Sequence, residues 1–388
     1  MTEPLPRKRI AYVSINDPRD KRSWSGITYY LGQTLQKNIG DVDYLGPVPI
    51  PWVLDKLFRV LQKSSRAVFG SEWIPKYSLL KNAYAAWYLG RKMRGQQYDF
   101  ILAPAAGPEL AYLRTQAPVV YFGDATYKLY STFYKKEFAN VNSFSRWEGE
   151  LLEKKALRKS DLIVLTSAWA SQSAVQDYGV RADKIEIMQF GANIDQVPSR
   201  DLIFDKEQNP TLTLFFLSVD WERKGGDIAF EALQSLHARG IAARLIVCGC
   251  VPPPQYQHPG LEVISFLNKN DPADFKRFVE LFASVHFLLL PTRADCTPVV
   301  NSEANAYGVP AITTDVGGVS GTVLDGVNGY CLPFAARGDA YADLIARLYA
   351  DKAGYHQLIA SSRDKFEQEL NWEAWAKSFK ELLAKHSL

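Results

Sequence analysis

One stretch of the sequence constrains the fold more than any other, the run FLLLPTRADCTPVVNSEANAYGVPAITTDVGG from Phe287 to Gly318. It begins with a short apolar segment, continues through a polar loop and a helix-like segment, and ends with a second apolar segment and a glycine pair. This order predicts a strand, a helix and a second, parallel strand. We therefore expect an α/β protein.

The middle of this run contains a helix start at Thr297 and Pro298, because a threonine oxygen can cap the first amides and proline fits the first helical position. The N–H groups of Val299 and Val300 would then be left without helical partners. An anion such as a diphosphate is favoured at such a helix end. Glu303 follows one turn after Val299 on the same face, where its carboxylate could accept two hydrogen bonds from a ribose diol.

A second acid, Asp295, lies eight positions before Glu303 in the preceding loop, where it is free to reach another polyol. The alternative is that Asp295 is a solvated loop residue and Glu303 an ordinary charge near a helix start. Arg293 could form an ion pair with Asp295 or bind a ligand.

Two acids separated by seven residues and followed by ANAYGVPAITTDVGG make this stretch resemble the signature of the retaining glycosyltransferases of family four. The resemblance implies the GT-B fold, in which two Rossmann-like domains face each other across a cleft and a C-terminal helix crosses back to the first domain. It also implies that Asp295 and Glu303 hold a nucleotide-sugar donor. Asp295 itself departs from the family pattern, which usually has a glutamate there.

The chain is long enough for two domains. We expect an acceptor-binding domain over residues 1–197, completed by residues 371–388, and a donor-binding domain over residues 205–370. The polar, proline-bounded stretch 197–210 would contain the linker.

Near the C-terminus, Trp372, Trp375 and Phe379 recur at helical spacing, as aromatic anchors of the returning helix would. Farther upstream, the stretch VSGTVLDGVNGYCLP contains Asp-Gly and Asn-Gly turn signals, which predict a short hairpin.

Two cations precede a glycine pair at the first strand-to-helix turn of the expected second domain. Lys224 can place a compact positive charge on a phosphate, and Arg223 can add a planar fork. The resemblance implies donor-diphosphate contacts for both. The family usually has a Gly-Arg pair at the end of the preceding strand, whereas this chain has Ser218 at the arginine position. The alternative is that the two cations form a solvated basic turn.

In the first domain, the family has a glycine-rich turn beside the donor phosphates and the acceptor, and this chain offers Ser25 and Gly26. Asp124 lies just past an apolar run, where ligand groups often lie in open α/β sheets. The family often has a histidine near this position, but all five histidines here lie after residue 230. Either Asp124 replaces that sugar contact or it is only a turn residue.

Residues 50–94 interleave apolar and aromatic side chains with nine lysines and arginines, against only Asp55 and Glu72. A basic helix with an apolar face and tryptophans such as Trp52, Trp73 and Trp87 can lie at an anionic membrane surface. The alternative is that the apolar side packs on the first domain. We expect no nucleic-acid contact, because no recognisable binding module accompanies the basic residues.

Charge is divided unevenly along the chain. Residues 1–160 hold 25 Lys and Arg against 14 Asp and Glu, a balance of +11, and residues 161–388 hold 20 against 28, a balance of −8. This division suggests that the first half faces an anionic partner. The four cysteines show no framework spacing and suit a reducing cytoplasm, and we expect neither a cleavable signal nor a membrane span.

Taken with the resemblance, these features predict a retaining, metal-independent hexosyltransferase without a resident cofactor, whose donor is a UDP-sugar or GDP-sugar. Its acceptor would be a lipid-linked or surface glycan, and its location cytoplasmic, with peripheral contact at the inner face of the cell membrane through residues 50–94. The expected catalytic residues are Asp124, Arg223, Lys224 and Asp295. The expected donor-binding residues are Gly26, Arg223, Lys224, Asp295, Thr297, Pro298, Val299, Val300 and Glu303. A sugar-nucleotide epimerase and a non-catalytic nucleotide-sugar-binding subunit remain the alternatives.

Overall fold

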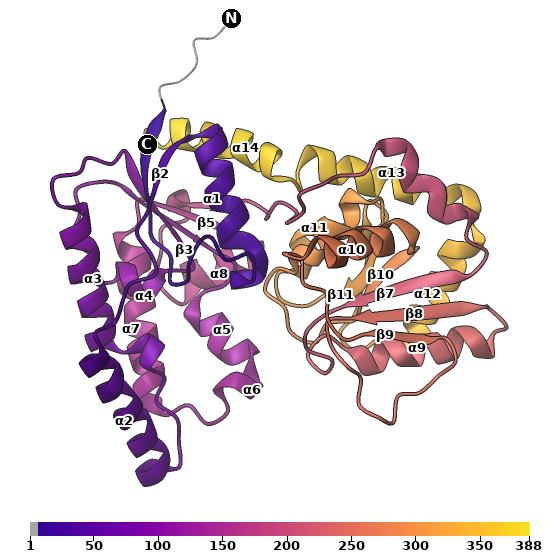
Figure 1. The fold of residues 1–388 in the computed structure, drawn as a ribbon, viewed down its shortest axis with the longest axis horizontal. Helices are drawn as coiled ribbons and strands as arrows, with labels where there is room; N and C mark the ends of the chain where they lie inside the picture. Colours follow the sequence, from indigo (N-terminus) through magenta and orange to yellow (C-terminus); the bar gives the residue numbers. More distant parts are fainter. Residues whose placement is uncertain (1–6) are drawn as a thin grey trace, which may run out of the picture. The chain divides into compact units, whose positions relative to one another are not determined.

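The computed structural model describes residues 7–388, and the chain divides into two compact units (Figure 1). The first unit contains Met1–Met188 together with Ala376–Leu388, and the second contains Gln189–Trp375. This division falls shortly before the stretch in which the sequence predicted a linker. The first six residues, part of the segment in which no cleavable signal was found, lie outside the described residues.

The first unit is built on a six-stranded parallel sheet in the order β2-β1-β3-β4-β5-β6. Its strands are β1 (Lys8–Tyr12), β2 (Gly40–Tyr44), β3 (Phe100–Pro104), β4 (Val119–Gly123), β5 (Leu162–Leu165) and β6 (Ile185–Ile187). The central strands β3, β4 and β5 are buried along their whole length, as expected for a parallel sheet covered on both faces.

The helices of the first unit are α1 (Ile27–Asn38), α2 (Trp52–Phe69), α3 (Leu79–Met93), α4 (Gly107–Leu110), α5 (Tyr127–Phe133), α6 (Lys135–Phe138), α7 (Ser143–Lys159) and α8 (Ala168–Gln176). Short 3₁₀ helices lie at Ser23–Gly26, Pro75–Tyr77 and Ala182–Lys184. Trp73, one of the tryptophans considered for a membrane surface, instead packs inside the unit, where it is buried and its indole N–H donates to Glu148 over 2.7 Å. Trp52 and Trp87 are exposed.

The returning C-terminal helix predicted from the aromatic spacing is present as α14 (Trp372–Lys385), and its residues from Ala376 onward belong to the first unit. Phe379 is fully buried and its ring centroid lies 6.1 Å from that of Phe100 in β3. Lys385 pairs with Glu186 of β6 at 2.6 Å. The helix therefore completes the core of the first unit.

The second unit has another six-stranded parallel sheet, in the order β12-β11-β10-β7-β8-β9. Its strands are β7 (Leu212–Leu217), β8 (Ala243–Cys248), β9 (Leu261–Ile264), β10 (Phe287–Leu290), β11 (Ala311–Thr314) and β12 (Gly329–Leu332). The strand order reverses direction between β7 and β10, as in a Rossmann-like sheet. The run from Phe287 to Gly318 forms β10, a helix and β11, as its pattern predicted.

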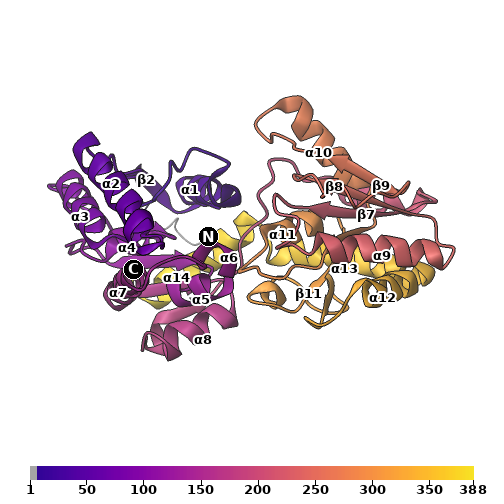
Figure 2. The ribbon, with the colours of Figure 1, turned by 90° about the horizontal axis from the view of Figure 1, so that it is seen from below.

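The helices of the second unit are α9 (Gly226–Ala238), α10 (Pro272–Ser284), α11 (Val299–Ala306), α12 (Gly338–Ala350) and α13 (Lys352–Gln368), with 3₁₀ helices at Arg200–Gln208 and Val319–Gly321. Helices α9 and α12 pack against each other, as Figure 2 shows. The predicted hairpin after Gly318 is wrong. Its Asp-Gly and Asn-Gly turns instead lead into β12, which adds to β11 in parallel.

Candidate functional site

The candidate cations and the first candidate acid of the second unit lie in two loops that follow neighbouring strands. One loop follows β7 and contains Arg223 and Lys224, and the other follows β10 and contains Asp295. Strands β7 and β10 pair with each other where the strand order reverses. In open α/β sheets, ligands bind at the carboxyl ends of the strands at this reversal point.

The two loops are held together by backbone contacts. The amide of Arg293 donates to the carbonyl of Arg223 over 2.8 Å. Gly225 has a φ of +73°, and a Cβ atom there would lie 2.0 Å from the carbonyl oxygen of Pro291. Only glycine therefore allows this close approach, which fixes the position of Lys224 against the loop after β10.

Lys224 and Asp295 form an ion pair through Nζ and Oδ2, with only 12% and 9% of their side chains exposed. Burial lowers the pKa of Lys224, and the neighbouring Arg223 adds to that shift. The carboxylate of Asp295 opposes it by favouring the ammonium form. Each charge is thus compensated inside the protein, and an anion binding to Lys224 would have to take the place of Asp295.

Arg223 lies beside this pair and is held by its own loop. Its Nη1 donates to the carbonyl of Ala294 over 3.0 Å, and its Nε lies 3.4 Å from Oδ2 of Asp220. Arg293 does not form the ion pair with Asp295 that was one of the two alternatives considered from the sequence. Its guanidinium carbon lies 3.5 Å from the centroid of the Phe334 ring, and Nη2 donates to the Phe334 carbonyl over 2.6 Å.

Helix α11 begins one residue later than predicted. Pro298 occupies the N-cap position and no side chain caps the helix there. The Thr297 hydroxyl donates to the carbonyl of Cys296 over 2.7 Å, so the proposed threonine cap is wrong. Val299 and Val300 are the first two helical residues, and their amides are among those that have no acceptor within the helix. The anion-binding end predicted for this helix is therefore retained without the capping side chain.

Glu303 is buried on α11, with 3% of its side chain exposed, and pairs with Lys269 at 2.8 Å. Lys269 comes from the loop between β9 and α10, and its Nζ also lies 4.3 Å from the centroid of the Phe278 ring. Sequence reasoning missed Lys269 because one lysine in a polar loop carries no local signal. The second candidate acid, like the first, is thus compensated by a lysine.

The opposite end of α11 is held by two cations that sequence reasoning also missed. Nζ of Lys206 donates to the carbonyl of Tyr307 over 2.5 Å, and Nη1 of Arg363 donates to that of Ala306 over 2.6 Å. Both side chains are buried, and burial lowers the pKa of Lys206 to about 7. Positive groups at a helix C-terminus satisfy its last carbonyls and complement its dipole. They therefore fix the position of α11 from its far end.

In the first unit, Gly26 and Asp124 come together around Trp24. Gly26 is the N-cap of α1 with a φ of +88°, and the two residues before it, Trp24 and Ser25, have φ values of +47° and +54°. Positive φ is costly for residues with a Cβ, so this turn is strained. Asp124 follows β4, and a hydrogen bond joins its carboxylate to the Trp24 side chain.

Burial raises the pKa of Asp124 to about 6, and the hydrogen bond from Trp24 opposes that shift. A third strained residue, Ala105, follows the neighbouring strand β3 with a φ of +48°. Strained backbone of this kind clusters at functional sites. The carboxyl ends of β1, β3 and β4 therefore form a second candidate site, and it belongs to the first unit alone.

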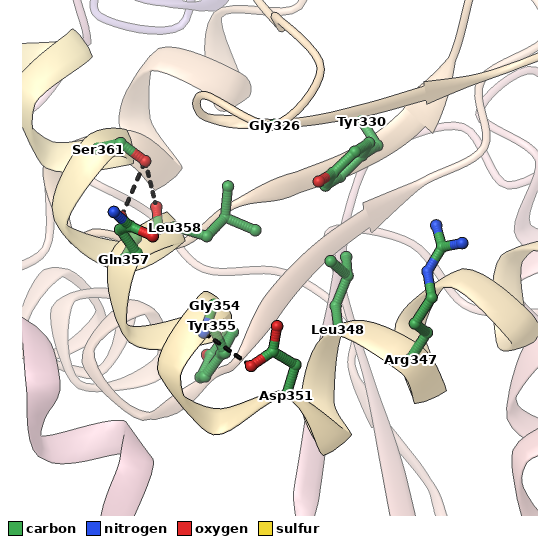
Figure 3. Close-up of a pocket in the computed structure, with 10 residues that line it drawn as sticks. All are labelled: Gly326, Tyr330, Arg347, Leu348, Asp351, Gly354, Tyr355, Gln357, Leu358 and Ser361. Atoms are coloured by element: carbon green, nitrogen blue, oxygen red, sulfur yellow. Dashed lines mark hydrogen bonds between the residues drawn. The ribbon is translucent and has the colours of Figure 1, made fainter.

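A pocket of about 590 Å³ lies elsewhere in the second unit (Figure 3). It is lined by residues of α12 and α13 and the segment between them, by Gly326 just before β12 and by Tyr330 within β12. Asp351 points toward α13, where its carboxylate accepts a hydrogen bond from the amide of Gly354 over 2.9 Å. None of the candidate residues lines this pocket, so it is separate from the site at β7 and β10.

The two parallel sheets with their helices define the class of protein, a two-domain, Rossmann-like α/β protein of the GT-B fold. Residues 211–351 match the model of the family described as glycosyl transferases group 1.

Among curated proteins, the chain is 25% identical over 222 residues to a D-inositol 3-phosphate glycosyltransferase of Nocardia farcinica, covering 52% of this chain and 48% of the relative. It is 27% identical over 242 residues to the putative colanic acid biosynthesis glycosyltransferase WcaL of Salmonella typhimurium, covering 58% and 57%. The chain thus spans about half the length of the curated relatives it matches.

Two solved structures share the fold over almost the whole chain. A sucrose-phosphate synthase from Thermosynechococcus elongatus has a TM-score of 0.69 at 18% identity and covers 98% of this chain and 99% of its own. HepE from Anabaena, solved in complex with UDP and glucose, has a TM-score of 0.64 at 15% identity and covers 98% and 100%. At these identities the likeness concerns the fold alone.

Proposed function

We propose that the protein transfers a sugar from a nucleoside-diphosphate sugar to an acceptor hydroxyl with retention of the anomeric configuration. The observation that supports this most directly is the pair of buried acids, Asp295 in the loop before α11 and Glu303 on α11, each paired with a lysine. Each acid and its lysine could bind one polar part of a nucleotide-sugar, and the first amides of α11 have no acceptor within the helix. The family match and the UDP complex of a structural neighbour agree with such a donor.

Donor binding would proceed by exchange of partners. The diphosphate would bind to Lys224 and Arg223 and to the first amides of α11, those of Val299 and Val300. Asp295 would then be able to accept hydrogen bonds from the sugar hydroxyls. The ribose diol replaces Lys269 at Glu303. The cations and amides neutralise the leaving diphosphate, so the proposal requires neither a metal ion nor a resident cofactor.

The transfer step would follow a front-face route. The bond between the anomeric carbon and the phosphate oxygen breaks, and the acceptor oxygen bonds to the same carbon from the same face. The acceptor proton passes to the departing phosphate oxygen, so no protein base is required. Asp124 is the alternative base, and its pKa of about 6 would leave it ionised at neutral pH.

The acceptor that we propose is a lipid-linked or surface glycan, used on the cytoplasmic side of a membrane. A relative named for colanic acid biosynthesis supports a glycan acceptor. Among residues 7–388, none of the helices has the length and apolarity needed to cross a bilayer, so any membrane contact by this part of the chain would be peripheral.

Product analysis tests the proposal. The purified chain is incubated with a panel of UDP-sugars and GDP-sugars, with and without a lipid-linked glycan fraction, and the products are separated by mass and anomeric configuration. A new glycoside with retained configuration is the expected result. A converted sugar formed without acceptor would instead identify an epimerase, and donor binding without any turnover would identify a non-catalytic subunit.

Glu303→Gln is the informative variant for donor binding, because it preserves the side-chain shape and removes the charge. Glu280→Gln is its matched control, since Glu280 is an exposed acid on α10. We expect UDP binding measured by calorimetry to weaken in the first variant only.

A further inference from the structure

Helix α2 of the first unit exposes most of its apolar side chains. Only Phe58 and Ser65 of its 18 residues are buried. Trp52 and Phe69, at its two ends, are 73% and 75% exposed. The other exposed apolar residues of the helix are Val53, Leu57, Val60, Leu61 and Val68. Contiguous exposed apolar surface on this scale marks an interaction site.

The apolar and basic residues of α2 occupy different sectors of the helix. At 3.6 residues per turn, Leu57, Leu61 and Val68 share one side, adjacent to the buried stripe of Phe58. Val53 and Val60 continue that side away from the core. The four basic residues fall on the remaining side and recur three and four positions apart: Lys56, Arg59, Lys63 and Arg66. The core of the unit therefore covers only one edge of a wider apolar face.

Neighbouring elements extend this surface. Figures 1 and 2 both show α3 next to α2. On α3, Leu80 and Trp87 are exposed, and the guanidinium of Arg91 lies 5.9 Å from the centroid of the Trp87 ring. Phe144 and Trp147, exposed in the first turns of α7, follow Asn142, whose amide donates to Ser65 of α2 over 3.0 Å. Exposed aromatic side chains are thus also found on α3 and α7, two helices of the same unit.

The charge around this face selects an anionic partner. Residues 50–94 contain nine basic residues and two acids. Both acids pair with basic residues of α2, Asp55 with Arg59 at 2.8 Å and Glu72 with Arg66. An apolar sector beside a basic sector, with tryptophan and phenylalanine at the helix ends, matches a helix lying in the interface of an anionic bilayer.

We propose that α2 is an interfacial membrane helix. Its apolar face, defined by Val53, Leu57, Val60, Leu61 and Val68, enters the boundary between headgroups and acyl chains, and its basic residues contact lipid phosphates. The contact does not depend on the sugar-transfer proposal, because it uses no residue of either candidate site.

Vesicle flotation of the full chain tests the proposal. The probes are vesicles of phosphatidylcholine alone and vesicles containing phosphatidylglycerol. The expected result is strong binding to the anionic vesicles, weaker binding to neutral ones and a loss of binding as salt is raised. Absence of binding to the anionic vesicles would overturn the proposal.

Two double variants separate the apolar and electrostatic contributions. Leu57→Glu with Leu61→Glu is expected to reduce vesicle binding at least tenfold, and Lys56→Gln with Lys63→Gln several-fold, with a smaller preference for anionic vesicles. Val251→Glu, at an exposed apolar position of the second unit, is the matched control. Unchanged thermal unfolding shows that each variant is folded. Equal binding of wild type and the Leu variants would overturn the proposal.

Depth-dependent quenching tests the geometry. Phospholipids brominated on the acyl chain should quench tryptophan fluorescence of the vesicle-bound wild type, and Trp52→Phe should reduce that quenching. The membrane proposal fails if the wild type does not bind vesicles but self-associates in solution, and if Leu57→Glu with Leu61→Glu abolishes that self-association. The apolar face would then be a contact between two copies of the chain.

Discussion

The acids of the two units are accommodated in different ways. In the second unit, Asp295 and Glu303 are buried and each contacts a lysine, Lys224 and Lys269 respectively. In the first unit, Asp124 has a hydrogen bond from Trp24, and within residues 7–388 no ion pair to it is found. Burial is therefore compensated by opposite charge in one unit and raises a pKa in the other.

This difference shows how similar residues can serve different purposes. An acid paired with a lysine can exchange that lysine for the hydroxyls of a ligand. An acid without such a partner responds to pH and can lose or gain a proton near neutrality. The following variants remove one side of the comparison at a time.

The largest effect is expected for Lys224→Met. It leaves the buried carboxylate of Asp295 without its partner, which should lower the free energy of unfolding by about 3 to 5 kcal/mol. It should also reduce UDP binding about a hundredfold or more, because the phosphate loses its main cation. Chemical denaturation and calorimetry measure the two effects.

The double variant Lys224→Met with Asp295→Asn is the control for this experiment. It should recover much of the stability but none of the UDP affinity. Recovery of both, or of neither, would contradict the view that the pair is compensated internally and that Lys224 is the phosphate ligand.

Glu303→Gln should have the second largest effect. Loss of charged hydrogen bonds to the ribose would cost about 1.5 to 3 kcal/mol, equivalent to roughly a ten- to hundredfold weaker UDP affinity. UDP and uracil are compared by calorimetry. Equal losses for both ligands would mean that Glu303 does not contact the ribose.

Asp124→Asn tests whether Asp124 makes the free energy of unfolding depend on pH. Its native pKa of about 6 exceeds the value of an unfolded aspartate, so the native state binds the proton more tightly. Its contribution to stability is present below about pH 4 and is lost as pH rises through 6. Relative to the variant, the wild type should lose about 1 to 3 kcal/mol of unfolding free energy over this range.

Denaturant titrations of both proteins at pH 4, 5, 6 and 7 measure that difference. If the free energies of unfolding of wild type and variant change with pH in the same way, the prediction is wrong. The same variant tests the transfer route, since near-full activity excludes Asp124 as an essential base.

The smallest effect is expected for Lys269→Gln. Lys269 is more exposed than the buried Glu303 that it contacts, so the pair is open to solvent on one side and contributes little to stability. UDP affinity should change by less than about fivefold, well below the effect of Glu303→Gln. A larger loss would make Lys269 a direct donor ligand rather than the partner that the ribose replaces.

The sequence predicted the parts of the molecule that depend on local pattern. The run from Phe287 to Gly318 contained its own strand, helix and strand, and the aromatic spacing of the C-terminal helix was correct. The sequence predicted that Lys224 lies in a strand-to-helix turn and that Asp295 lies in the loop before a helix, and the structure places both loops at the reversal point of the sheet. Their direct ion pair was not predicted.

The remaining features depend on contacts between distant segments. Lys269 and Glu303 are brought together only by the packing of the loop before α10. Trp73 was considered for a membrane surface because it lies among basic residues, but it is buried and donates a hydrogen bond to Glu148, 75 positions away. The turn signals after Gly318 were read as a hairpin because local turn chemistry does not specify which strand will be the partner.

The two ion pairs also affect which small molecules the second unit can retain. Inorganic phosphate could replace Asp295 at Lys224 but would leave that carboxylate buried without its partner. A free pentose could replace Lys269 at Glu303 but would leave the pair of Lys224 and Asp295 in place. A molecule that carries a diphosphate, a diol and a sugar offers a partner to Lys224, to Asp295 and to Glu303 at once. Under the proposed function, fragments of the donor are therefore discriminated against before any chemistry occurs.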